Sequence, residues 1–278
     1  MRIDLLLGRA GARLASAGSP TARLDAEVLA MKVLGVDRTW LYTWGDRPME
    51  PLARARFEAL VAARAQGTPV AYLTGEREFW GLTLETAPST LIPRPDTETL
   101  VTAALEKAQA DVGRFLDLGT GTGAIALAVA SERPAWHVTA VDLSVDAVAL
   151  ARRNARRHGL QVRVQQSDWF TAVAGERFDL IASNPPYIDP DDPHLDLGDV
   201  RYEPASALVA ADRGLADLFT IADQAREHLT VGGWLMMEHG FDQATAVRDQ
   251  LIALGYANAS SLRDLAGHSR VTLGQWLP

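Results

Sequence analysis

From residue 114 onward, short apolar segments alternate with helical ones, and this alternation limits the possible folds more than any other feature. Helical patterns at 122–132 and 145–159 separate some of these segments. The strand-like segments are 114–119, 137–143, 162–169, 178–184, 233–240 and 270–277. The alternation predicts a mostly parallel, doubly wound α/β sheet, which binds ligands outside the carboxyl ends of its strands.

The N-terminal part of the chain has a different pattern. Apolar residues recur every three or four positions over 3–18, 22–35 and 50–67, which predicts a small helical bundle. Aromatic and β-branched residues then surround a glycine in the segment EFWGLTL, as in a hairpin. We therefore expect three parts: a helical bundle over 1–78, a hairpin and linker over 79–94, and an α/β domain over 95–278.

Composition excludes several functional classes. The chain has no cysteine and six scattered histidines, so disulfides and thiolate metal sites are excluded and no metal is expected. No run approaches the roughly 18 apolar residues of a membrane span, and the N-terminus differs from a secretory signal, so a cytoplasmic protein is predicted. The net charge of −8 argues against broad binding of nucleic acid.

A glycine-rich turn follows the first predicted strand. Gly119, Gly121 and Gly123 would let the backbone pass close to a ligand and expose the amides of the next helix. Asp142 ends the second strand, where a carboxylate can accept both hydroxyls of a ribose. This pattern fits NAD and S-adenosylmethionine equally, and tight packing with Asp142 as a helix cap is the structural alternative.

Asp168 and Trp169 end the third predicted strand. An indole beside a polar group suits an adenine ring, which needs stacking on its face and a contact at its edge. The structural alternative is that Trp169 belongs to the core and Asp168 caps a helix.

The fourth predicted strand ends in Asn184, Pro185, Pro186 and Tyr187. The side-chain oxygen of Asn184 and the carbonyl of Pro185 are two acceptors that could hold both hydrogens of a planar NH₂ group, beside the aromatic face of Tyr187. The prolines stiffen the loop and remove competing donors. A hydride-transfer enzyme needs a proton relay instead, so this loop favours methyl transfer to nitrogen over a purely structural turn.

The motifs LIPRPDTE, LDLGTGTGAIALA, SNPPYI, YEPASAL, GGWLMMEHG and DLAGHSRV occur in this order behind the helical region. Together they resemble the peptide-chain release factor glutamine methyltransferases over essentially the whole chain. The resemblance implies a class I S-adenosylmethionine-dependent methyltransferase fold, Rossmann-like, with a mostly parallel seven-stranded sheet behind a substrate-docking bundle. It also implies methylation of the glutamine N5 in the GGQ motif of class 1 release factors.

By motif position, the resemblance implies two sets of site residues. The glutamine would contact Asn184, Pro185, Pro186 and Tyr187, with Asn184, Pro185 and Tyr187 catalytic. The cofactor S-adenosylmethionine would contact Gly119, Thr120, Gly121, Thr122, Gly123, Asp142, Trp169 and Asn184. One departure from relatives is VAADRG at 209–214, where they often have glycines.

Other interpretations compete with this one. A nucleic-acid amino methyltransferase would share the glycine turn and NPPY but should carry a strongly basic appendage, whereas residues 1–80 hold 11 basic and 9 acidic side chains. A helical interaction module fused to an inactive cofactor domain is a third hypothesis, opposed by the intact Asn184 and Tyr187. The acidic segment 189–199 could suggest a hard-metal site but fits a solvated loop better. Arg94 and Glu98 could line the site entrance or act as cap and linker.

Overall fold

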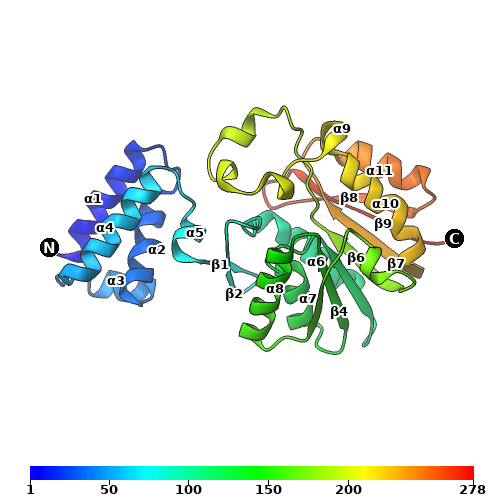
Figure 1. Ribbon diagram of the computed structural model, residues 1–278, viewed down its shortest axis with the longest axis horizontal. Coiled ribbons are helices and arrows are strands. Elements are labelled where there is room, and N and C mark those ends of the chain that lie inside the picture. The colour runs from blue at the N-terminus through cyan, green and yellow to red at the C-terminus, as the bar shows by residue number, and fades with distance from the viewer. The chain divides into compact units, whose positions relative to one another are not determined.

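The computed structural model describes residues 1–278, which form two compact units. The first unit comprises residues 1–76 and 194–202. Its helices, blue to cyan in Figure 1, are α1 (Ile3–Ser16), α2 (Ala22–Leu34), α3 (Arg38–Thr43), α4 (Pro51–Ala65) and α5 (Val70–Thr74). Leu14, Leu29 and Phe57, from three of these helices, are almost wholly buried in one apolar core.

Local signals set the helix boundaries in this unit. The carboxylate of Asp37 accepts a hydrogen bond of 2.7 Å from the amide of Trp40 and so caps α3. Pro51 occupies the first turn of α4, where its missing N–H costs nothing. Gly35 ends α2 in the left-handed conformation, with φ of 67°. The helices expected over 3–18, 22–35 and 50–67 are confirmed.

The acidic segment after the NPPY loop belongs partly to this first unit. The nearly buried guanidinium of Arg64 bonds to the carboxylates of Asp25 at 2.8 Å and Asp199 at 2.7 Å. The hydroxyl of Tyr202 donates to the carbonyl of Gln66 at 2.7 Å. The expected solvated loop is therefore anchored at its end, although Asp196 is exposed. The structure contains no group of three or more acidic, histidine or cysteine side chains placed to hold a metal.

The second unit, residues 77–193 and 203–278, contains a seven-stranded sheet in the order β5-β4-β3-β6-β7-β9-β8. The five strands from β5 to β7 are parallel, and β9 is antiparallel to both of its neighbours. The strands are β3 (Arg114–Leu118), β4 (His137–Asp142), β5 (Val162–Gln166), β6 (Phe178–Ser183), β7 (Leu229–Glu238), β8 (Ala257–Arg263) and β9 (Ser269–Gln275). This confirms the predicted mostly parallel, seven-stranded sheet. A separate hairpin pairs β1 (Glu76–Phe79) with β2 (Leu82–Glu85).

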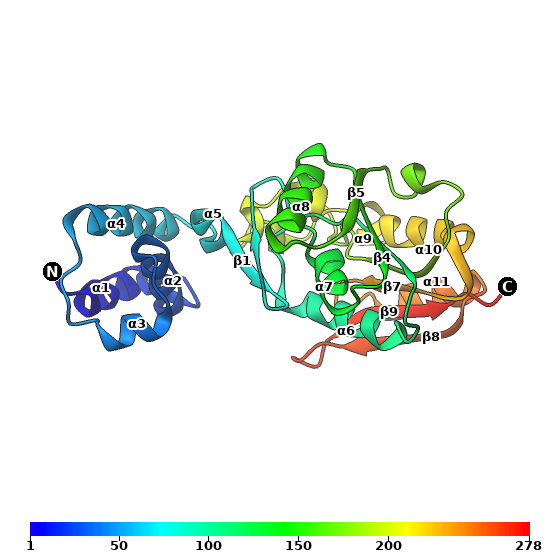
Figure 2. The same cartoon turned by 90° about the horizontal axis from the view of Figure 1, so that it is seen from below.

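Helices cover both faces of the sheet (Figure 2). Alternate strand residues point to opposite faces, so Phe115 packs into one core and Leu116 into the other. The first core contains α6 (Glu98–Lys107), α7 (Ala124–Glu132) and α8 (Val145–His158), and the second contains α10 (Ala216–His228) and α11 (Ala244–Ala253). A short helix, α9 (Ala211–Gly214), precedes α10. None of the helices is both long and apolar enough to cross a membrane.

Candidate active site

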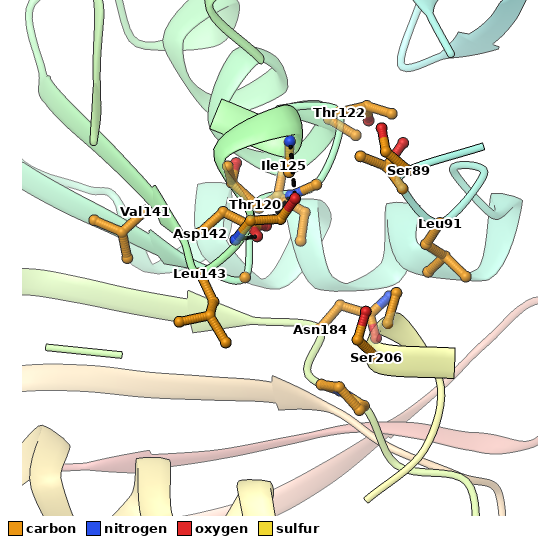
Figure 3. A pocket seen from close by; sticks show the side chains of 18 of the residues that line it. Ser89, Leu91, Thr120, Thr122, Ile125, Val141, Asp142, Leu143, Asn184 and Ser206 are labelled. Atoms are coloured by element: carbon orange, nitrogen blue, oxygen red, sulfur yellow. Dashed lines mark hydrogen bonds between the residues drawn. The ribbon is translucent and has the colours of Figure 1, made fainter. Parts of the chain in front are cut away.

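A cavity of about 450 Å³ opens beyond the carboxyl ends of β3, β4 and β6 in the second unit. This is the edge at which doubly wound sheets bind ligands. Figure 3 shows Thr120 and Asp142 on one side of the cavity and Asn184 with Ser206 on another. Of the residues predicted to form the site, these line the cavity: Gly119, Thr120, Gly121, Thr122, Asp142, Trp169, Asn184 and Pro186. Gly123, Pro185 and Tyr187 do not line it directly.

The glycine turn joins β3 to α7, and its backbone requires glycine. Gly119, Gly121 and Gly123 have φ of 69°, 56° and 89°, in the left-handed region that side chains disfavour. A Cβ on Gly123 would also lie 3.1 Å from the Cδ1 of Leu127. The turn therefore leaves the start of α7 accessible from the cavity, as expected for a ligand that approaches the backbone closely.

A buried carboxyl lies directly beneath this turn. Asp117, near the end of β3, accepts hydrogen bonds from the hydroxyl of Thr120 at 2.5 Å and from the amide of Ala126 at 3.2 Å. Its Oδ1 has no partner. Complete burial raises the pKa of Asp117 to about 7, although the bond from Thr120 opposes the shift.

Asp142 closes the turn from the end of β4. Its Oδ2 accepts from the amide of Gly121 at 2.8 Å and its Oδ1 from the amide of Ser144 at 2.9 Å. Ser144, and not Asp142, is the side-chain cap of α8. Burial raises the pKa of Asp142, while the two amide bonds act against the shift. Asp142 thus links the glycine turn to the adjacent helix while its side chain faces the cavity.

Trp169 follows β5 in a strained conformation. Its φ of 40° is rare for a residue with a large side chain. Its indole lies over the glycine turn, with Cζ3 3.7 Å from the position that a Cβ of Gly119 would take. The ring also packs against the second core, in line with the structural alternative, while its contact with an adenine stays a prediction. Asp168 lines the cavity beside it.

Asn184 supplies an unpaired acceptor. Its Nδ2 donates to the hydroxyl oxygen of Thr97 at 3.3 Å, whereas its buried Oδ1 has no hydrogen-bond donor within the chain. A buried acceptor without a donor costs about 1–3 kcal/mol. Such an atom at the wall of a cavity is what a site for an NH₂ group requires, and Figure 3 shows Asn184 at that wall.

Tyr187 holds the far end of the NPPY loop. Its amide donates to the carbonyl of Leu208 at 3.1 Å, and its hydroxyl donates to Oε1 of Glu238 at 3.3 Å. Gln243 donates to the carbonyl of Tyr187 at 2.9 Å. Burial, and then the neighbouring charge of Glu238, raises the pKa of Tyr187, so its hydroxyl stays protonated. The amide, the carbonyl and the side-chain hydroxyl of Tyr187 are therefore each held by a hydrogen bond.

The segment that departs from relatives packs against this carbonyl. A Cβ on Gly214 would lie 2.0 Å from the carbonyl oxygen of Tyr187, so only glycine fits there. The two preceding residues, Asp212 and Arg213, have φ of 52° and 58°. Asp212 and Arg213 therefore strain the backbone at two positions where a glycine would carry no strain.

Three contributors to the site, Thr97, Glu203 and Glu238, were missed as functional side chains, whereas Arg94 was one of two residues expected at the site entrance. Glu203, buried, accepts from the amide of Ile92 at 2.8 Å and forms an ion pair with Arg94, which lines the cavity. Thr97 and Glu238 support the NPPY loop from behind. All four residues lie in the motifs on which the resemblance rests, but the neighbouring sequence does not show which side chains they contact. Glu98 instead accepts from the amide of Trp80 at 3.1 Å.

Two family models match the chain. Residues 6–75 match the PrmC N-terminal domain, and residues 95–211 match the methyltransferase small domain. A release factor glutamine methyltransferase from Vibrio cholerae is 53% identical over 99% of this chain and 96% of its own length. Another from Pseudomonas aeruginosa is 56% identical over 93% of this chain and 94% of its own length.

The chain belongs to the release factor glutamine methyltransferase family. This confirms the resemblance that the ordered motifs predicted. Solved structures agree on the methyltransferase fold. A methyltransferase from Pyrococcus furiosus matches with a TM-score of 0.56 and 20% identity, over 80% of this chain and 98% of its own. A 16S rRNA methyltransferase from T. thermophilus in complex with AdoMet matches with a TM-score of 0.53 and 19% identity, over 72% and 49%.

The family member described here is an S-adenosylmethionine-dependent methyltransferase, and the cofactor prediction is confirmed. Its cavity fits that cofactor. It has the size of a small-molecule site, an open glycine turn, a carboxylate on Asp142 and an indole on Trp169. No nicotinamide is needed to account for these features.

Proposed function

We propose that this enzyme acts in the cytoplasm on class 1 peptide-chain release factors, where it methylates the side-chain nitrogen N5 of the glutamine in the GGQ motif. The names and near full-length similarity of the curated relatives support this substrate. The observation that carries the proposal is the buried Oδ1 of Asn184, an acceptor that no group of the chain satisfies. A primary amide has two N–H donors, and one of them would complete this atom.

We assign the cofactor to the side of the cavity formed by the glycine turn. The residues proposed to hold it are Gly119, Thr120, Gly121, Thr122, Gly123, Asp142, Trp169 and Asn184. Asp142 would accept the ribose hydroxyls, and Trp169 would cover the adenine. When bound, S-adenosylmethionine supplies a methyl group made electrophilic by its sulfonium.

We assign the glutamine to the NPPY loop. The lone pair of an amide nitrogen is delocalised into its carbonyl, so the nitrogen is a poor nucleophile. Asn184 Oδ1 and the carbonyl of Pro185 would each accept one N–H, and the ring of Tyr187 would lie against the amide plane. Two fixed acceptors hold the nitrogen in line with the methyl group.

Methyl transfer to the amide nitrogen needs no strong base. A nitrogen–carbon bond forms as the sulfur–carbon bond breaks, which leaves S-adenosylhomocysteine and an N-methylated amide. The positively charged nitrogen is far more acidic than the starting amide, so it releases one proton after transfer. The chain therefore contributes orientation and electrostatics.

We further propose that residues 1–78 dock the release factor, with 79–94 as hairpin and linker and 95–278 as the catalytic domain. The bundle holds no group of acidic, histidine or cysteine side chains placed to bind a metal and has a slight excess of basic side chains. No direct contact with nucleic acid is expected.

One experiment tests the substrate. Purified enzyme and labelled S-adenosylmethionine are incubated separately with class 1 release factor, ribosomal subunits and DNA, and the labelled residue is identified by mass spectrometry. Label on the GGQ glutamine alone is the expected result. Label on RNA or DNA, with none on the release factor, would replace this function with that of a nucleic-acid amino methyltransferase.

A further inference from the structure

Arg94 is the only cationic residue that lines the cavity. Three carboxylates line it as well, those of Asp142, Asp168 and Asp217. S-adenosylmethionine has two cationic groups, its sulfonium and its ammonium, and one anionic group, the carboxylate of its methionyl part. A carboxylate that enters a cavity lined by others of its kind is repelled unless a cation faces it. Arg94 is therefore the one side chain of the lining that can neutralise this group.

Two prolines and a buried glutamate hold Arg94 in place. Pro93 and Pro95 flank it, and a residue before proline favours the extended backbone that Arg94 adopts, with φ of −97° and ψ of 142°. Its Nη2 donates to Oε2 of Glu203, whose side chain is fully buried. The amide of Ile92 donates to Oε1 of the same carboxylate at 2.8 Å. Both the backbone and the side chain of Arg94 are therefore restrained.

The ion pair with Glu203 leaves most of the guanidinium available to a ligand. A guanidinium carries five N–H donors in a planar fork. Within the chain only the Nη2 of Arg94 takes part in a hydrogen bond, and 31% of the side-chain surface remains exposed. The remaining donors can form the short, charge-assisted bonds that arginine makes with a second carboxylate.

The segment that carries Arg94 lies across the cavity from the proposed adenosine site. Figure 3 shows Leu91 of this segment opposite Leu143, the residue after Asp142, with Asn184 between them in this view. Asp142 is proposed to accept the ribose hydroxyls, and the methyl group must reach the amide held at Asn184. The sulfonium joins the adenosine to the methionyl part, so the methionyl part extends toward the segment of Arg94.

Resting on this proposed placement of the cofactor, we propose that Arg94 is a cofactor-binding residue, whose guanidinium pairs with the methionyl carboxylate of S-adenosylmethionine. Glu203 holds one nitrogen of the guanidinium from the protein side, and the cofactor carboxylate accepts from the side that faces the cavity. Arg94 thereby makes the site selective for adenosine compounds that carry this carboxylate.

The acceptor amide offers Arg94 no comparable partner. It has no charge, and its only acceptor is the carbonyl oxygen. A guanidinium that donated to this oxygen would draw the nitrogen lone pair further into the carbonyl. The nitrogen would become a poorer nucleophile, so the chemistry of the reaction favours the cofactor carboxylate as the partner of Arg94.

The test measures the binding of three ligands by calorimetry, with no release factor present. They are S-adenosylmethionine, its decarboxylated form, which lacks only the carboxylate, and 5′-methylthioadenosine, which lacks the whole amino acid portion. The wild type should bind S-adenosylmethionine about 10- to 100-fold more tightly than the decarboxylated form, the usual scale for hydrogen bonds between charged groups. Equal affinity for these two ligands would overturn the inference.

The decisive variant combines Arg94→Met with Glu203→Gln, which removes the cation without leaving a buried carboxylate unpaired. It should bind S-adenosylmethionine about 10- to 100-fold more weakly and bind 5′-methylthioadenosine as the wild type does. Arg94→Lys keeps the charge but not the planar fork, so its affinity for S-adenosylmethionine should fall between the two. The matched control combines Arg114→Met with Glu176→Gln, an ion pair at the start of β3 and outside the cavity lining, and should bind all three ligands normally.

Two results in the folded double variant R94M/E203Q would overturn the inference. One is an unchanged preference for S-adenosylmethionine over its decarboxylated form, and the other is an equal loss of affinity for all three ligands, as a purely structural role predicts. If neither Arg94 variant folds, the preference of the wild type decides. Asp142→Ala should weaken all three ligands alike, because each contains the ribose, and so tests the placement of the cofactor separately. Failure of the wild type to methylate release factor would refute the proposed function without changing these affinities.

Discussion

Replacing Asn184 with alanine should separate the chemistry of the site from the stability of the fold. The change removes one acceptor aimed at the substrate amide and one donor to Thr97, the latter at the long distance of 3.3 Å. Loss of one positioned contact to a transition state costs about 2–4 kcal/mol, so single-turnover methyl transfer should fall by about 10²–10³. The folded protein loses only one weak hydrogen bond, worth about 1 kcal/mol or less.

The unpaired oxygen makes the stability effect smaller still. Oδ1 of Asn184 is buried without a donor, which costs the ligand-free enzyme about 1–3 kcal/mol. Alanine removes that cost together with the bond to Thr97. We therefore expect the melting temperature of Asn184→Ala to stay at or above that of the wild type.

Asn154 offers a matched control because its buried amide is fully satisfied. Its Oδ1 accepts from the amide of Glu85 at 2.7 Å, and its Nδ2 donates to the carbonyls of Glu85 and Thr122 at 3.0 and 2.9 Å. Asn154→Ala should lose about 3 kcal/mol of stability, at about 1 kcal/mol a bond. At saturating cofactor, its folded fraction should transfer methyl much faster than Asn184→Ala.

Thermal melts and single-turnover transfer at saturating cofactor, measured on both variants, decide the matter. The reasoning is refuted if Asn184→Ala melts as early as Asn154→Ala and transfers methyl at the wild-type rate. Asn184 would then be a structural amide. A defect that disappears at saturating cofactor would make it a cofactor contact only.

Three further predictions concern the cofactor, the bundle and the strained turn. Calorimetry should show binding of S-adenosylmethionine and none of NAD, and Asp142→Ala should weaken the former by about 1–3 kcal/mol; tight NAD binding would reverse the assignment. Deleting residues 1–78 should leave cofactor binding intact in a folded remainder and raise KM for whole release factor far more than for a GGQ peptide, whereas equal losses would remove the docking role. Asp212→Gly should raise the free energy of unfolding by about 1 kcal/mol in denaturant melts, because φ of 52° strains a side chain; no gain would show that Asp212 makes a compensating contact.

Much of the sheet could be predicted because its strands are short apolar runs between helices. Strand β8 could not, because its sequence ANASSLR is polar and lies at the edge of the sheet. Edge strands need one packed face only, so their hydrophobic signal is weak. The tie between Asp199 and Arg64 was missed for a related reason, since local sequence cannot show which distant side chain an exposed-looking acid will meet.

In the candidate site, too, some residues could be located from the sequence and others could not. The glycine turn, Asp142 and Asn184 could be located because each stands at the end of a predicted strand, where the topology itself directs ligands. Glu203 and Glu238 could not be located, because a glutamate in a single sequence is expected to face solvent. Their roles depend on contacts made only after folding, Glu203 with Arg94 and Glu238 with Tyr187.

The pattern of unsatisfied atoms ties the fold to the chemistry. Only four buried side-chain atoms lack a hydrogen-bond partner, and three belong to Asp117, Asn184 and Glu238. These residues lie at the carboxyl ends of β3, β6 and β7, which are consecutive in the sheet. Each such atom costs stability, so a chain selected for stability alone would not gather them at one edge. Of the three, Asn184 lines the cavity, where a buried acceptor without a donor is what a site for a substrate amide would show.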